Sequence, residues 1–219
     1  MKIRNGFVTN SSSSSFIIQK TGEDNRDKVF EVVRKLFMDI PDIIVKDMQV
    51  AHEILGINDA SELDNISRTQ RDKLRNKTTF SPYEISYYAS YELPGWINCK
   101  TYAEYEKYIG IADNTGSEPF IIVDFNNVDK HNQKEVDALD AIVAWYDRNG
   151  DVDSCSEPED EIPEEDRAFN GWSYVNITKL MKAAKKIGDF GIYSSGYAIP
   201  SVIEELLGKI SCTYCTHMG

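Results

Sequence analysis

The segment Pro119-Phe120-Ile121-Ile122-Val123-Asp124 is a short apolar run that ends on a carboxylate. It has no polar face, and this pattern is typical of a strand in the centre of a sheet. A helix is predicted soon after it, from about Lys134 to Tyr146. The predicted buried stripe of that helix consists of Val136, Leu139, Ile142, Val143 and Tyr146. The strand and the helix together predict a layered core.

Elements of both kinds are predicted towards the C-terminus. A helix is expected up to Ile187, starting at Asn176 or Thr178, because either side chain can cap it. Residues 191–199 are expected to form a strand or a loop, and residues 209–214 a final strand that closes the sheet.

The N-terminal side adds one strand and several helices. Residues 16–18 predict a short buried strand, and an apolar stripe at residues 29–37 predicts a helix. Pro41 is expected to end that helix, because proline restricts the residue before it. A second helix is predicted over residues 46–55, and a more polar helix or helix pair over residues 61–76.

Tyrosines concentrate in the middle of the chain. Between residues 83 and 92 every second residue is apolar or aromatic and the others are mostly polar, and this period of two predicts a half-buried strand with one face formed by Tyr83, Ile85, Tyr87, Ala89 and Tyr91. A helix is predicted over residues 101–109, with Tyr102, Tyr105, Tyr108 and Ile109 facing inward. Both patterns assign most tyrosines to the core, although exposed tyrosines would suit an interface or a stacking platform for bases.

The interleaved helices and strands predict an α+β fold, with a mixed α/β arrangement as the alternative. The 219 residues suit a single domain, residues 1–219, with a central, mostly antiparallel or mixed sheet packed by several helices. Residues 151–167 are predicted to be an acidic mobile loop, because nine carboxylates and two prolines occur there with no cation before Arg167. A subdomain boundary is the alternative for this segment.

The chain is acidic, with a formal net charge of −12 at pH 7. This charge disfavours broad binding to nucleic acids or to anionic membranes, which are polyanions themselves. Two basic clusters, at residues 68–77 and 179–186, qualify that statement. Each is interpreted as the solvated face of a helix, with local binding of a polyanion as the alternative.

The C-terminal run holds the most concentrated soft metal ligands. A C-x-x-C turn at Cys212 and Cys215, together with His217, would supply three ligands to a zinc ion. Candidates for the fourth ligand are Cys99, Cys155, His131 and His52. A redox pair, or a tail with no site at all, are the alternatives.

Asp124 is the candidate catalytic residue, because it ends the strand described first. Carboxylates at strand ends hold Mg²⁺ in phosphoryl-transfer and nuclease sites. Aspartates at strand ends also cap loops, and no second acidic strand end pairs with this one. The sequence contains no glycine-rich phosphate loop and no nucleophile elbow.

The N-terminal segment from Gly6 to Phe16 reads G-F-V-T-N followed by five serines and a phenylalanine. It resembles a start shared by uncharacterised proteins of tailed bacteriophages and prophages, close to G-F-V-S-N-S-S-S-S-S-F, with Thr9 in place of a serine. The ending Cys215 to Gly219 is similar to a C-x-H-M-G tail of the same group. The resemblance implies a phage or prophage origin and implies no particular activity.

The five serines are candidate binding residues: Ser11, Ser12, Ser13, Ser14 and Ser15. Their hydroxyl groups can donate hydrogen bonds to a phosphate or a carboxylate. A docking tag, a modification site and a flexible arm are the alternatives, and composition favours the arm.

Two functional hypotheses follow. The first is a phage-encoded accessory protein that binds another macromolecule, most simply a phage or host protein, and is virion-associated or directed at a host factor. The second is a metal-dependent enzyme with an unrecognised site. The apolar core of a signal peptide does not follow residues 1–4, so we expect the host cytoplasm or the virion as the location.

Overall fold

The computed structural model describes residues 14–19, 25–112, 120–147, 159–170, 173–195 and 212–218. The chain divides into two compact units. Unit 1 comprises residues 1–30 and 109–219, and unit 2 comprises residues 31–108. The single domain stays a prediction, and the acidic segment 151–167 lies within unit 1 and not at a boundary between the units. The fold class is α+β, as predicted.

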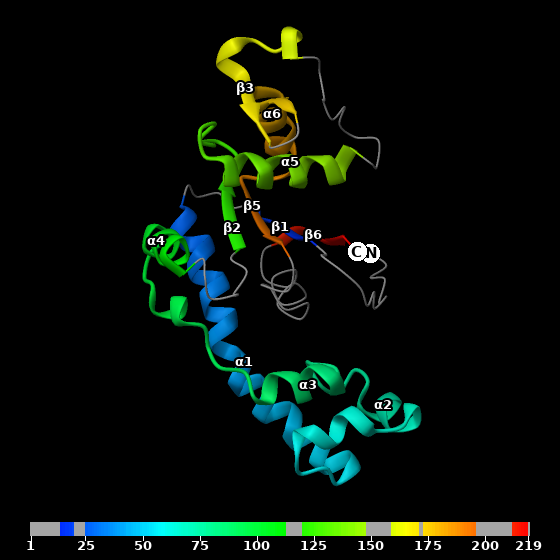
Figure 1. The fold of residues 1–219 in the computed structure, drawn as a ribbon. Coiled ribbons are helices and arrows are strands. Elements are labelled where there is room, and N and C mark those ends of the chain that lie inside the picture. Colours follow the sequence, from blue (N-terminus) through cyan, green and yellow to red (C-terminus); the bar gives the residue numbers. More distant parts are fainter. Residues whose placement is uncertain are drawn as a thin grey trace. The chain divides into compact units, whose positions relative to one another are not determined.

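Unit 1 is built on a four-stranded sheet with the order β2-β5-β1-β6, in which every neighbouring pair is antiparallel (Figure 1). The strands are β1 (Ser14–Gln19), β2 (Phe120–Asp124), β5 (Phe190–Ser195) and β6 (Cys212–Met218). The predicted strands at residues 16–18 and 119–124 are therefore confirmed. The last strand extends four residues beyond its predicted end at Tyr214.

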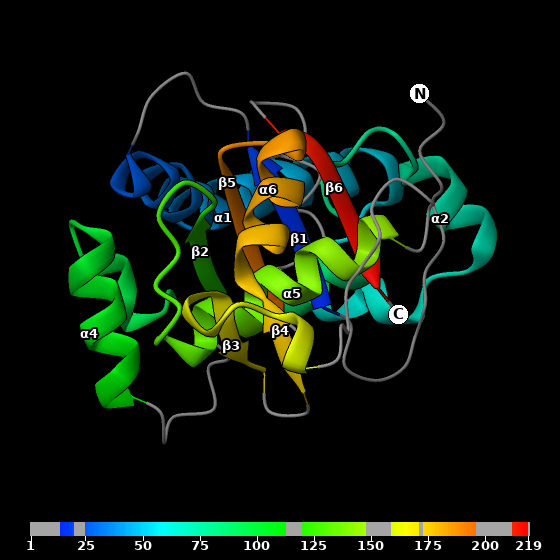
Figure 2. The same cartoon turned by 90° about the horizontal axis from the view of Figure 1, so that it is seen from above.

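Two helices cover one face of this sheet, α5 (Gln133–Asp147) and α6 (Ile177–Ile187) (Figure 2). Val123, Phe125 and Ile142 are buried between the sheet and α5, as the stripe of α5 predicted. Gly191 of β5 allows this close approach, because a Cβ atom there would lie 2.6 Å from Cδ1 of Ile142. The predicted cap of α6 is confirmed, since the Asn176 side chain accepts a hydrogen bond from the N–H of Lys179.

The opposite face of β2 carries Phe120 and Ile122, because side chains alternate along a strand. Phe120 lies against Phe30 of α1 (Arg26–Leu55), with ring centroids 6.3 Å apart. Only the first residues of α1, up to Phe30, belong to unit 1. Val29 and Phe30 are buried there, and the contact of Phe30 with Phe120 places the start of this helix against β2.

Part of the acidic segment has secondary structure that its composition did not predict. It contains two short 3-10 helices, η3 (Glu159–Glu161) and η4 (Glu164–Asp166), and leads into a small hairpin. The hairpin pairs β3 (Arg167–Phe169) with β4 (Tyr174–Asn176). Ile162 is buried and its carbonyl accepts a hydrogen bond from Nε of Arg167, which fixes this part of the segment. Residues 151–158 lie outside the described part.

Unit 2 consists of the remainder of α1, the helices α2 (Arg68–Leu74), α3 (Pro82–Ala89) and most of α4 (Tyr102–Ala112), and two 3-10 helices. These are η1 (Ala60–Asn65) and η2 (Gly95–Asn98). The predicted end of a helix at Pro41 is wrong, because α1 continues through it to Leu55. Phe37, Ile40 and Ile44 are all buried on one stripe, and this packing outweighs the local cost of a proline.

The predicted strand over residues 83–92 is also wrong, because α3 occupies its first part. A reciprocal capping box starts this helix: Ser81 Oγ accepts from the N–H of Glu84, and Glu84 Oε2 accepts from the N–H of Ser81. Pro82 takes the first helical position, where its missing N–H costs nothing. Ile85 is fully buried and anchors the helix.

The core of unit 2 is aromatic. Trp96 meets Phe37 and Tyr105 edge to face, with ring centroids 4.9 and 5.4 Å away. Tyr102 and Tyr105 are buried as predicted, whereas Tyr108 is exposed. Among the described residues, no helix has both the length and the apolar content needed to cross a membrane.

Candidate functional site

Two hollows are candidates for a site, one in each unit. The first, called here the polar hollow, lies where β2 ends and α5 begins, and has a volume of about 700 Å³. Its lining is almost entirely polar: Arg26, Asp124, Asn127, Val128, Asp129, Lys130, His131 and Glu135. The structure therefore brings the predicted catalytic residue Asp124 together with His131, two further carboxylates and two cations.

Glu135 is the only buried charged residue among those that line the polar hollow. Its Oε1 accepts a hydrogen bond from Nη1 of Arg26 at 3.0 Å, and the side chain of Glu135 is only 5% exposed. Its Oε2 accepts from the backbone N–H of Asp129 at 3.1 Å. Glu135 thus joins the first turn of α1 to the loop before α5, which is a structural role.

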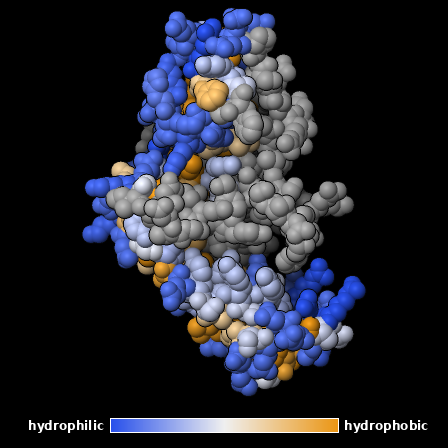
Figure 3. All heavy atoms as spheres, viewed as in Figure 1, coloured by the Kyte–Doolittle hydropathy of each residue, from blue (hydrophilic) through white to orange (hydrophobic). Residues whose placement is uncertain are grey.

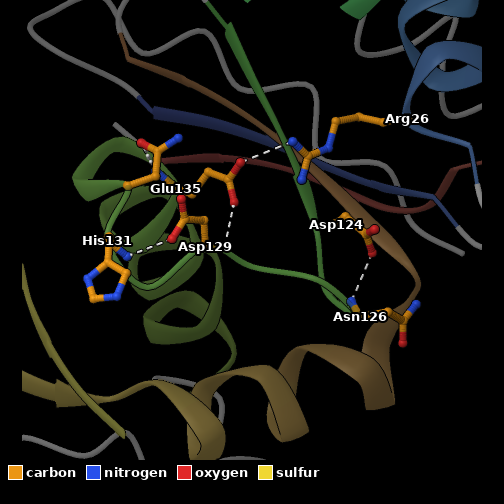
Figure 4. A network of polar contacts seen from close by, with 7 residues as sticks. Arg26, Asp124, Asn126, Asp129, His131 and Glu135 are labelled. Atoms are coloured by element: carbon orange, nitrogen blue, oxygen red, sulfur yellow. Dashed lines mark hydrogen bonds and ion pairs between the residues drawn. The ribbon is translucent and has the colours of Figure 1, made fainter. Parts of the chain in front are cut away.

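The two aspartates of the polar hollow shape the loop that carries them. Asp124 Oδ1 accepts from the N–H of Asn126, and Asp129 Oδ1 accepts from the N–H of His131, each at 2.9 Å (Figure 4). A side chain that binds the backbone two residues on is an Asx turn. The geometry thus shows the loop-capping role that was the alternative for Asp124, while its catalytic role stays a prediction.

Among the described side chains, no group of three His, Cys, Asp or Glu residues is placed so that it could hold a metal ion. The side chains of Cys212, Cys215 and His217 lie outside the described part, so the zinc prediction is untested. The backbone differs from the expected C-x-x-C turn, because all three residues belong to strand β6. They pair with Gln19, Ile17 and Ser15 of β1, respectively.

The structure describes two of the five serines. Ser14 and Ser15 belong to β1, where they pair with Ser195 and Ser194 of β5. Ser11, Ser12 and Ser13 lie outside the described residues. A flexible arm is therefore wrong for the last two serines, and the predicted binding role stays a prediction.

The second candidate, called here the tyrosine groove, lies in unit 2 along α3 and beside η1. Its volume is about 410 Å³, and its lining consists of Asp64, Tyr83, Ser86, Tyr87, Ser90 and Tyr91. Tyr83 is 65% exposed and Tyr87 is 61% exposed. The prediction that most of these tyrosines lie in the core is therefore wrong for the two that lie four residues apart on α3.

Two further tyrosines of this region, Tyr88 and the lining residue Tyr91, are partly buried. Tyr88 meets Tyr87 and Tyr91 edge to face, with ring centroids 5.0 and 5.5 Å apart. Burial raises the pKa of the Tyr91 hydroxyl to about 12 and also raises the pKa of Tyr88. Both hydroxyl groups are therefore neutral at physiological pH and can donate or accept a hydrogen bond.

The basic cluster at residues 68–77 borders the tyrosine groove. Nη2 of Arg71 donates to the carbonyl of Asp64, a groove residue, at 3.5 Å. Figure 3 shows side chains of intermediate hydropathy over α3 and strongly hydrophilic ones over the neighbouring α2. The sequence pattern did not indicate that the two features meet. The capping signal at residues 81–84 contained the missing information, because it makes Tyr83 and Tyr87 residues of one helix.

The chain matches no protein-family model, and neither the curated proteins nor the solved structures contain a match to it.

Proposed function

We propose that the protein is a phage-encoded accessory protein that acts by binding a macromolecule, and that the tyrosine groove of unit 2 is its binding surface. The phage-like N-terminus supports the origin. The observation that carries the binding role is the exposure of Tyr83 and Tyr87, at 65% and 61%, on a short helix. We expect it to work in the cytoplasm of the host or as part of the virion.

Tyrosine and serine suit a binding surface for physical reasons. Tyrosine offers a large rigid ring with a polar tip, and serine adds hydrogen bonds at low cost in conformational entropy. Tyrosine is enriched in interface cores relative to other surfaces. The capping box and the buried Ile85 hold α3 in place, so the rings are presented on a preorganised element.

The test compares partner capture by three proteins from cells infected by, or carrying, the phage. These are the wild type, the double variant Tyr83→Ala/Tyr87→Ala, and a control double variant, Phe169→Ala/Tyr174→Ala. The control pair is exposed like the two tyrosines, and it belongs to the β3–β4 hairpin of unit 1, where its ring centroids are 5.6 Å apart. We expect a partner that the wild type and the control retain and the tyrosine variant loses. Identical retention by all three proteins would contradict the proposal.

The alternative function is a metal-dependent enzyme. Asp124 is its candidate in the polar hollow, and Cys212, Cys215 and His217 are its candidates at the C-terminus. Metal analysis of the purified protein with and without Cys215→Ser tests the second set. About one zinc per chain, lost in the variant without loss of stability, would favour the enzyme, whereas zinc lost together with stability would indicate a structural site.

A further inference from the structure

We infer that the tyrosine groove binds a short segment of single-stranded nucleic acid, with bases stacked on Tyr83 and Tyr87 and phosphates beside the cations of α2. This inference rests on the proposed function and specifies the class of the macromolecule. It differs from broad nucleic-acid binding, which the net charge of −12 disfavours, because it concerns one groove.

The two exposed rings form a stacking platform. Tyr83 and Tyr87 are four residues apart on α3, so they share one face with about 5–6 Å between their Cβ atoms. Aromatic side chains at such a spacing can each accept a base, and stacking tolerates any base because all have a π face. Ser86 lines the same groove and can donate a hydrogen bond to a phosphate or sugar oxygen, whereas Ser90 Oγ donates to the carbonyl of Tyr87.

The charge next to the platform is positive. Five exposed cations occur between residues 65 and 81, with Asp72 as the only acidic residue in that range. They are Arg68, Arg71, Lys73, Arg75 and Lys77. Arg71 reaches the edge of the groove through its hydrogen bond to the carbonyl of Asp64. Asp64 is the only carboxylate among the groove residues, so a phosphate backbone in the groove meets one like charge and the more numerous exposed cations beside it.

The acidity of the chain lies mainly outside this unit. Residues 31–108 contain 13 acidic and 10 basic residues, so unit 2 carries −3 of the net charge of −12. A single strand offers planar bases for the rings and anionic groups for the adjacent cations. This combination favours it over an uncharged peptide, which would use the rings alone.

The experiment measures the fluorescence anisotropy of a labelled oligothymidylate of about twelve nucleotides, within the usual range of site sizes. We expect saturable binding by the full-length protein, with a lower affinity for a duplex of the same length. Tyr83→Ala/Tyr87→Ala should weaken binding at least about tenfold. Arg71→Gln/Arg75→Gln should make the salt dependence shallower, by about 0.7 in the logarithmic slope for each phosphate that the variant no longer neutralises.

Two control variants test the location of the site. Lys182→Gln/Lys186→Gln removes the same number of cations from α6, where both lysines are exposed, and Phe169→Ala/Tyr174→Ala removes the exposed ring pair of unit 1. Both should bind like the wild type. Absence of binding by the wild type, or equal loss in the control variants, would overturn the inference.

The capture experiment separates this inference from the proposed function. If the oligonucleotide does not bind but the tyrosine variant still loses a captured protein, only the inference fails and the partner is a protein. If neither the oligonucleotide nor a captured partner depends on the two tyrosines, both the inference and the proposed function fail.

Discussion

The polar hollow of unit 1 and the tyrosine groove of unit 2 are both open to solvent, but they use their side chains differently. In the polar hollow, Glu135, Asp124 and Asp129 all accept hydrogen bonds from the surrounding chain. In the tyrosine groove, Tyr83 and Tyr87 present most of their surface to water. The larger and more highly charged hollow is thus the one whose polar groups serve the fold.

The difference shows why a set of acidic residues near a strand end is weak support for catalysis. A carboxylate that accepts backbone N–H groups stabilises a turn, and this role needs no ligand. Mostly exposed aromatic rings contribute less to the stability of the fold, because they bury little of their apolar surface. The comparison therefore predicts that substitutions in the polar hollow lower stability, whereas substitutions in the tyrosine groove lower binding.

Among the substitutions in the two hollows, Glu135→Ala should have the largest effect on stability. The substitution removes the ion pair with Arg26 at 3.0 Å and also removes the acceptor for the N–H of Asp129. Breaking a buried ion pair lowers the unfolding free energy by about 3 to 5 kcal/mol. We expect about 3 kcal/mol here, because the Arg26 side chain is 24% exposed. Urea unfolding, monitored by circular dichroism, measures the loss of unfolding free energy. Asp137→Ala on the exposed side of α5 is the control, and an equal loss in both variants would contradict a special role for Glu135.

Asp47→Ala tests whether a buried carboxylate in unit 2 behaves like the carboxylates of the polar hollow. Asp47 is 3% exposed, and its two oxygens accept from the N–H groups of Thr79 and Phe80 at 2.9 and 2.7 Å. We expect a loss of about 2 kcal/mol, because the substitution leaves two N–H groups without their acceptor. The same urea unfolding measures it. A loss below about 0.5 kcal/mol would show that water replaces the carboxylate.

The pH dependence of that loss has a definite sign. Burial raises the pKa of Asp47 above its ordinary value of 3.8, so the native state holds this proton more tightly than the unfolded state does. The contribution of Asp47 to stability is then full below pH 3.8 and declines as the pH rises through the native pKa. The stability difference between the wild type and Asp47→Ala should therefore be larger in acid than at neutral pH. Unfolding free energies at a series of pH values test this, and a difference that grows with pH would be the opposite result.

The sequence predicted secondary structure correctly where the pattern of apolar residues fitted only one kind of element. The run at residues 120–124 has no polar face, so it predicted the strand beside the polar hollow, and the stripe of α5 followed from helical spacing. It misled at residues 83–92, where the alternation of tyrosines satisfies a period of two while Ile85 and Tyr88 also satisfy a helical period. The capping box of Ser81 and Glu84 decides between these periods, and it is a local signal of four residues.

Other features depended on contacts that no local pattern contains. The ion pair of Arg26 with Glu135 joins residues 109 positions apart, so the role of Glu135 could not be inferred from its neighbours in the sequence. The continuation of α1 through Pro41 depends on the burial of Phe37, Ile40 and Ile44 on one stripe. Sequence spacing shows such a stripe, but it does not show whether the packing energy exceeds the cost of a proline inside the helix.

Asp124→Ala should have a smaller effect, about 1 kcal/mol, because it removes one exposed hydrogen bond, to the N–H of Asn126. Urea unfolding of the wild type and of Asp124→Ala, each with and without millimolar Mg²⁺, measures the effect. If the carboxylate serves only the turn, Mg²⁺ leaves the stability of both proteins unchanged. Stabilisation of the wild type by Mg²⁺ that Asp124→Ala abolishes would contradict a purely structural role for Asp124. The polar hollow would then be a metal site, and the enzyme alternative would gain support.

Tyr83→Ala/Tyr87→Ala should have the smallest effect on stability, below about 1 kcal/mol. Both rings are mostly exposed, and alanine is the better helix former. The main cost is the loss of the edge-to-face contact between Tyr87 and Tyr88, whose ring centroids are 5.0 Å apart. The gain in helix propensity partly offsets this cost. Ile85→Ala on the buried face of the same helix provides the contrast, with an expected loss of several kcal/mol. If the double tyrosine variant loses as much unfolding free energy as Ile85→Ala, the two tyrosines are part of the packing of unit 2. The exposed pair of rings on which binding depends would then not exist in solution.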